Sequence, residues 1–92
     1  MYAYFSGMAG KKKEDVIRKD VPEELKRLGE RIRNLRIKKG YTSHEIFAYE
    51  HNIPRAQYGR YERGEDLKYS SLLKIVQAHN MTLQEFFSEG FD

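Results

Sequence analysis

The sequence contains no cysteine and no tryptophan, and only two of its 92 residues are proline. Without cysteine the chain forms neither a disulfide framework nor a thiolate metal site, which suits the reducing cytoplasm where we expect it to work. No run of apolar residues approaches the ~20 that a membrane-spanning helix needs, so we expect no membrane partner. At this length we expect one small domain and no separate domain for a small-molecule substrate.

Charged residues are plentiful and unevenly distributed. They make up 34% of the chain, against 39% hydrophobic residues, a balance typical of a globular domain. Residues 1–64 carry 15 Lys or Arg against 9 Asp or Glu, whereas residues 65–92 carry 2 against 5. A basic region of this kind fits a polyanionic partner such as nucleic acid, although an unevenly charged solvated surface would have the same composition.

The chain divides into an N-terminal arm and one domain. Residues 1–20 combine an aromatic start, a glycine-containing break and the basic run Lys11–Lys13, and we expect them to form a flexible arm. Residues 21–92 show repeated helix signals, and no segment alternates apolar and polar residues as a half-buried strand would. The sequence therefore predicts an all-α domain over residues 21–92.

Five helices are expected, each with a capping or proline residue at its start. These starts are Asp20, Thr42, Pro54, Ser70 or Ser71, and Thr82. Three starts have a Glu three residues later, the pattern of a capping box: Asp20 with Glu23, Thr42 with Glu45, and Thr82 with Glu85. Glycine or asparagine, which tolerate the left-handed conformation, mark four of the ends: Gly40, Asn52, Gly64 and Asn80. The apolar side of the second helix is assigned to Ile46, Phe47 and Ala48.

The third expected helix, residues 54–63, places two kinds of side chain on opposite faces. At about 100° per residue, Tyr58 and Tyr61 share one face and point to the core. The other face carries cationic and small residues: Arg55, Ala56, Gly59, Arg60 and Arg63. Arginine binds guanine edges and phosphates in a bidentate manner, and small residues let a helix approach a surface closely. A short helix, a tight turn and then such a helix is typical of a helix-turn-helix unit.

The chain resembles the phage-repressor and Cro type of helix-turn-helix domain, called the XRE-like family. The resemblance spans roughly residues 25–87 and is carried by these segments: Ile32–Arg36, Phe47-Ala48, Ile53, Arg60–Gly64, Leu72–Ile75 and Leu83–Phe87. It implies a five-helix domain that binds double-stranded DNA, typically as a dimeric transcriptional regulator. It further implies that the third helix lies in the major groove with four residues at base-contacting positions: Arg55, Ala56, Gln57 and Arg60.

The same resemblance implies contacts to the DNA backbone and one internal ion pair. We expect phosphate contacts from basic and cap residues on three helices: Ser43, His44, Arg63, Lys38 and Lys39. Arg36 matches the family position that pairs with the third helix, and Glu62 borders the inward face, so we expect an ion pair between them. The sequence departs from the family where His51 and His79 replace leucines, and where Pro54 replaces a Ser or Thr cap.

Other classes of function have weaker support. His44 and His51 lie seven residues apart, too far to hold one metal, and no nucleophile elbow or glycine-rich phosphate loop is present. We therefore expect that the protein is not an enzyme and that it binds no metal and no cofactor. The alternative function is a protein-binding adaptor or antitoxin-like module with the same fold. For a homodimer, the expected contact is the aromatic end of the chain, Phe86, Phe87 and Phe91, with a second candidate surface at Tyr2, Tyr4 and Phe5.

Overall fold

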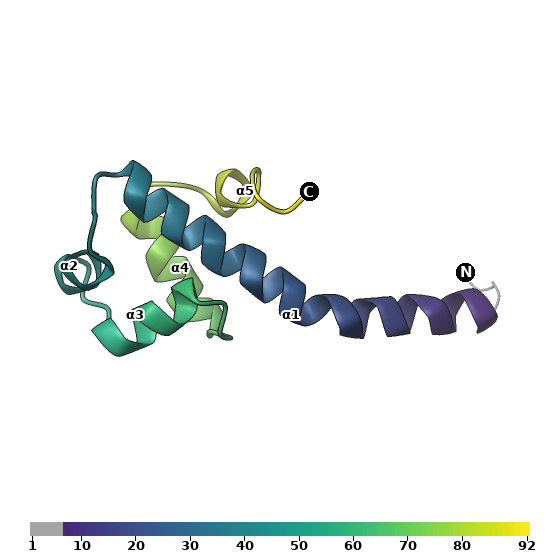
Figure 1. Cartoon of the computed structure of the whole chain (residues 1–92). Coiled ribbons are helices and arrows are strands. Elements are labelled where there is room, and N and C mark those ends of the chain that lie inside the picture. The colour runs from purple at the N-terminus through teal and green to yellow at the C-terminus, as the bar shows by residue number, and fades with distance from the viewer. Residues whose placement is uncertain (1–6) are drawn as a thin grey trace.

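The computed structural model describes the backbone of residues 7–92 and the side chains of residues 21–92. The described chain is helical, with no strand, and confirms the all-α prediction with five helices: α1 (Gly7–Lys38), α2 (His44–Glu50), α3 (Arg55–Glu62), α4 (Tyr69–Ala78) and α5 (Leu83–Phe86). Figure 1 shows the C-terminal half of α1 packed along the shorter helices, while its N-terminal half projects beyond them. The helix-turn-helix unit is formed by α2 and α3.

The first helix begins earlier than the sequence predicts. We expected a capped start at Asp20–Glu23, but α1 begins at Gly7 and continues through Pro22. An interior proline removes one backbone hydrogen bond at a cost of about 3 kcal/mol. Good helix formers, mostly Lys, Glu and Arg, flank the proline on both sides and continue the helix. The expected flexibility of residues 1–20, and the candidate surfaces within that range, lie outside the residues whose side chains are described.

The other helix ends follow the predicted stop residues. Asn52 and Asn80 adopt positive φ angles of 58° and 54°, and Gly40 and Gly64 adopt 102° and 92°. The capping box of α5 is present: the Glu85 backbone N–H donates to Thr82 Oγ1 at 3.1 Å, and the Thr82 N–H donates to the Glu85 carboxylate at 2.8 Å.

Two helix starts differ from the prediction. Ser43, not Thr42, caps α2, because it directly precedes the first helical residue and its Oγ accepts from the backbone N–H groups of Glu45 and Ile46. α4 begins at Tyr69, ahead of Ser70 and Ser71, and Lys68 at its N-cap position makes no side-chain capping bond. The extended backbone of Lys68 thus starts this helix without the expected serine cap.

The core lies where α1, α2, α3 and α4 meet, with α5 closing one side. Its largest fully buried side chains come from all five helices: Ile32, Phe47, Tyr58, Ile75 and Phe86. Tyr58 and Tyr61 face the core as predicted. Ile46 does not, since it is 53% exposed. The short helix α2 turns Phe47 and Ala48 inward and leaves Ile46 on its outer side.

Two histidines pack against Phe47 where the family has leucines. The ring centroid of Phe47 lies 4.2 Å from that of His51 and 5.1 Å from that of His79. His51 Nδ1 hydrogen-bonds the Phe47 carbonyl at 2.9 Å, whereas His79 Nε2 is buried without a hydrogen-bond partner. The core therefore holds one imidazole in a setting that opposes protonation.

Burial lowers the pKa of His79 to about 4, and the nearby charges of Lys39, His51 and Arg31 act in the same direction. In the unfolded chain a histidine has a pKa of about 6.5, so the unfolded state gains the proton first as pH falls. We expect stability to fall between pH 6.5 and 4, with His79 contributing about 1–2 kcal/mol because its ring is partly solvated. Urea unfolding of wild type and His79→Leu, measured near pH 7 and near pH 4.5, isolates this contribution. If both proteins lost the same free energy of unfolding between pH 7 and pH 4.5, the contribution of His79 would be contradicted.

Candidate nucleic-acid interface

One side of α3 faces solvent. The four residues predicted to contact bases are all exposed on this helix: Arg55, Ala56, Gln57 and Arg60. On the opposite side Tyr58 is fully buried and Tyr61 is nearly so, which holds the helix against the core. The Arg60 Nε lies 3.7 Å from the Glu65 carboxylate, an exposed ion pair just beyond the helix end. The helix thus presents two arginines and two smaller side chains to solvent, while its opposite side is held by the core.

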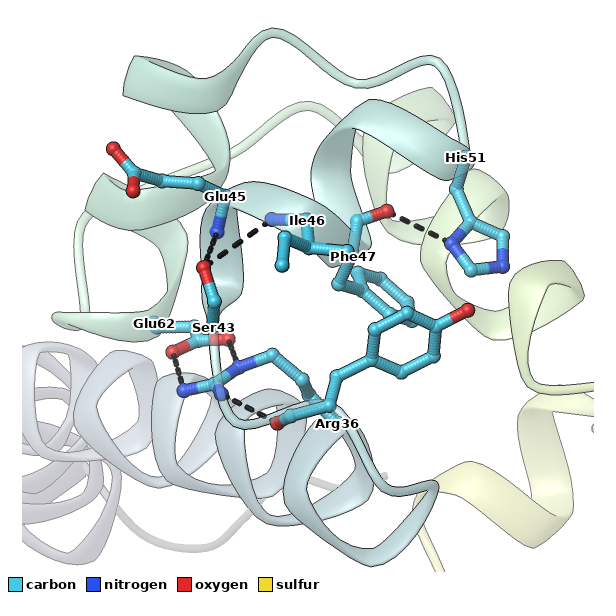
Figure 2. Close-up of polar contacts among 8 residues, drawn as sticks. Arg36, Ser43, Glu45, Ile46, Phe47, His51 and Glu62 are labelled. Atoms are coloured by element: carbon cyan, nitrogen blue, oxygen red, sulfur yellow. Dashed lines mark hydrogen bonds and ion pairs between the residues drawn. The ribbon is translucent and has the colours of Figure 1, made fainter.

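The position of α3 relative to α1 is held by the expected pair of Arg36 and Glu62. Arg36 Nε lies 2.7 Å and Nη2 lies 3.0 Å from the two carboxylate oxygens of Glu62, a bidentate geometry. Arg36 Nη1 also donates to the Tyr41 carbonyl at 2.8 Å, which ties the loop before α2 into the same group (Figure 2). Both side chains are buried. The hydrogen bond to Glu62 is the main cause of the raised pKa of Arg36.

The start of α2 lies beside α3. Ser43 uses its Oγ as the helix cap, as Figure 2 shows, and a hydroxyl that accepts in this way can still donate its hydrogen to another group. The His44 ring stacks near Tyr58 of α3, with a centroid distance of 6.4 Å. A Cβ added at Gly59 would lie 3.2 Å from His44 Nε2 and 3.3 Å from Arg63 Nη1. The structure therefore brings three predicted phosphate contacts, Ser43, His44 and Arg63, to the junction of α2 and α3.

Gly59 does not lie where the sequence suggested, whereas the two lysines at the end of α1 lie exposed. Gly59 was expected to let α3 approach DNA closely, but it is buried beneath His44 and Arg63. Lys38 is the last residue of α1 and Lys39 follows it, and both residues are exposed. The Lys39 charge acts on His79 at the end of α4. The phosphate contacts expected of Lys38 and Lys39 stay a prediction.

Arg31 is an important residue that sequence reasoning missed. It is 9% exposed, and its Nε donates to the Phe86 carbonyl at 2.7 Å while Nη2 donates to the Glu85 carbonyl at 3.1 Å. Its guanidinium carbon lies 5.5 Å from the Phe86 ring centroid. The available signal was its spacing, because Arg31 falls between Leu28 and Leu35 on the apolar side of α1. Arg31 fixes α5 and the aromatic C-terminal end to α1.

A shallow hollow beside Arg55 was also not predicted. It is lined by residues of the α2 cap and outer face: Ser43, Glu45, Ile46 and Tyr49. Tyr49 is 79% exposed, so an apolar surface adjoins the cationic start of α3. Within residues 21–92, no cluster of three or more His, Asp or Glu could hold a metal ion. No described helix combines the length and apolar character needed to cross a bilayer.

Among solved structures, the chain is similar to the restriction-modification controller protein C.AhdI from Aeromonas hydrophila, known from a high-resolution crystal structure. The two chains superpose with a TM-score of 0.63 and are 32% identical in sequence. The match covers 71% of this chain and 98% of that chain, so it takes in almost the whole controller protein. No family model matches the chain, and no curated protein matches it.

Proposed function

The chain belongs to the XRE-like family of helix-turn-helix proteins, and from this membership we propose that it is a sequence-specific double-stranded DNA-binding regulator of transcription. The observation that carries the proposal is the exposed row of Arg55, Ala56, Gln57 and Arg60 on a helix whose other side is anchored in the core. A helix presented in this way fits the major groove, where arginine reads guanine edges. The similarity to a controller protein supports a regulatory role and gives no support to an enzymatic role.

The residues around the start of α2 supply the contacts to the DNA backbone in this proposal. Ser43, His44 and Arg63 surround the junction of α2 and α3, so they flank the base-reading face. Backbone contacts set the register of a protein on the duplex and make its affinity depend on salt. Lys38 and Lys39, both exposed at the end of α1, are further candidates for backbone contacts.

Replacing Arg55 or Arg60 with alanine should weaken binding to the preferred duplex by about 1–3 kcal/mol each. Binding to unrelated duplexes should change much less, because those complexes rest on phosphate contacts. Fluorescence anisotropy on a selected and a scrambled duplex, at matched salt, measures both effects. Lys74→Ala on α4 is the control for loss of one exposed positive charge. Variants that bind the selected duplex as tightly as wild type would contradict base reading by α3.

A protein-binding adaptor is the second candidate, favoured by the exposed apolar pair Ile46 and Tyr49 on α2. An adaptor would use this surface and leave the α3 arginines without a role. Failure of the wild-type protein to bind any duplex above its binding to a polyanion such as heparin would favour this function. Arg55, which lines the same hollow as this pair, and Arg60, also exposed on α3, favour DNA over a protein partner.

Dimer formation is part of the proposed function, because one helix reaches only half of a typical operator and two half-sites lie about 34 Å apart. Phe87 is 44% exposed and its ring lies 4.9 Å from that of Phe91, whereas Phe86 is buried. Phe87 with Phe91 is the proposed contact between two copies. Light scattering at micromolar concentration should give a dimer mass for wild type and a monomer for Phe87→Ser. A strictly monomeric wild type, with and without DNA, would contradict the dimer.

A further inference from the structure

We propose that Gly59 is a positioning residue that lets His44 and Arg63 close on a single DNA phosphate. This inference rests on the proposed function, since it names the ligand of the junction between α2 and α3. His44 comes from the first turn of α2, and Arg63 is the C-cap residue of α3. Their side chains meet over the one α3 residue that has no side chain.

The geometry around Gly59 supports this role. A Cβ at this position would lie 3.2 Å from His44 Nε2 and 3.3 Å from Arg63 Nη1, so both nitrogen donors approach the same point. Both distances are shorter than ordinary carbon–nitrogen contacts, so an alanine would push the two side chains outward. Gly59 is not one of the residues with a positive φ angle. The backbone conformation therefore does not require glycine at this position. The limited space between the helix and the two side chains does.

The test compares wild type, Gly59→Ala, the double variant His44→Ala with Arg63→Ala, and the triple variant. Each is titrated with one selected duplex over a range of salt concentrations. Thermal unfolding of every variant is recorded beside the titrations. The double variant is the matched background, because a glycine that acts only through these two side chains has nothing to position there.

We expect Gly59→Ala to weaken binding about fivefold to tenfold and to lower the salt slope by about one phosphate contact, near 0.9. Its melting temperature should stay the same or rise by a few degrees, because alanine favours a helix. In the double-variant background, Gly59→Ala should change the affinity by less than about twofold.

Two results would overturn the inference while leaving the proposed function intact. One is a Gly59→Ala protein with the affinity and salt slope of wild type. The other is an equal loss of affinity in the presence and absence of His44 and Arg63, which would mean that Gly59 meets the DNA itself. A wild-type protein that binds no duplex would instead contradict the proposed function, and with it the role inferred for Gly59.

Discussion

Replacing Glu62 with alanine should lower the free energy of unfolding by about 3–5 kcal/mol, the cost of leaving one charge of a buried pair without its partner. Arg36 and Glu62 are 6% and 8% exposed at their side chains and bind each other through two short contacts. With the carboxylate gone, the guanidinium keeps the Tyr41 carbonyl and loses both of its anionic contacts. Chemical denaturation at neutral pH measures the loss.

The matched control for this change is Glu65→Ala. Glu65 also pairs with an arginine, but at 3.7 Å and with 57% of its side chain exposed. Exposed pairs are worth about 0–1 kcal/mol, so this variant should unfold almost as wild type does. If Glu62→Ala lowered the free energy of unfolding by less than about 1 kcal/mol, as the control does, the pair of Arg36 and Glu62 would add little to stability.

Replacing Gly29 with alanine should destabilise the protein by about 2–3 kcal/mol, because it overpacks the contact between α1 and α3. A Cβ at Gly29 would lie 2.7 Å from the Tyr61 carbonyl oxygen and 2.8 Å from both the Glu62 carbonyl oxygen and the Gly64 nitrogen. These are backbone atoms, which cannot rotate away as a side chain can. Alanine also gains about 1 kcal/mol of helix propensity, and the steric cost exceeds that gain.

Gly59→Ala is the control for this second substitution, since it is the same change in a helix of the same protein. Its neighbours are the ends of two flexible side chains, so it should keep its melting temperature. Thermal unfolding of the two variants side by side separates a backbone clash from a general effect of removing glycine. Equal melting temperatures for Gly29→Ala, Gly59→Ala and wild type would contradict the close contact of α1 and α3.

The parts of the fold that follow from local chemistry could be predicted from the sequence. Asn52 and Asn80 end helices because asparagine tolerates positive φ, and the capping box of Thr82 and Glu85 needs only two residues at fixed spacing. The inward face of Tyr58 and Tyr61 follows from helical periodicity. The pair of Arg36 and Glu62 joins two helices, and resemblance to the family supplied its partner assignment.

The parts that depend on tertiary contact could not be predicted in the same way. Gly29 and Gly59 are both helix glycines, and only the neighbouring elements show that one meets backbone and the other meets side chains. Arg31 is an arginine within an otherwise apolar stripe of α1, and only the fold shows that the carbonyl groups of Glu85 and Phe86 accept its hydrogen bonds. The start of α1 was misplaced because Pro22 is a local signal that the surrounding helix formers override.

Selection of bound sequences from a random duplex pool, with wild type and Arg60→Ala in parallel, tests most directly whether α3 reads DNA. Arg60 is exposed on α3 and makes only a weak surface pair with Glu65, so its loss should leave the fold intact. We expect wild type to enrich one defined sequence, and Arg60→Ala to enrich the same sequence with the preference relaxed at one base-pair position per half-site. No enrichment by wild type, or an identical preference at every position in both proteins, would contradict base recognition by α3.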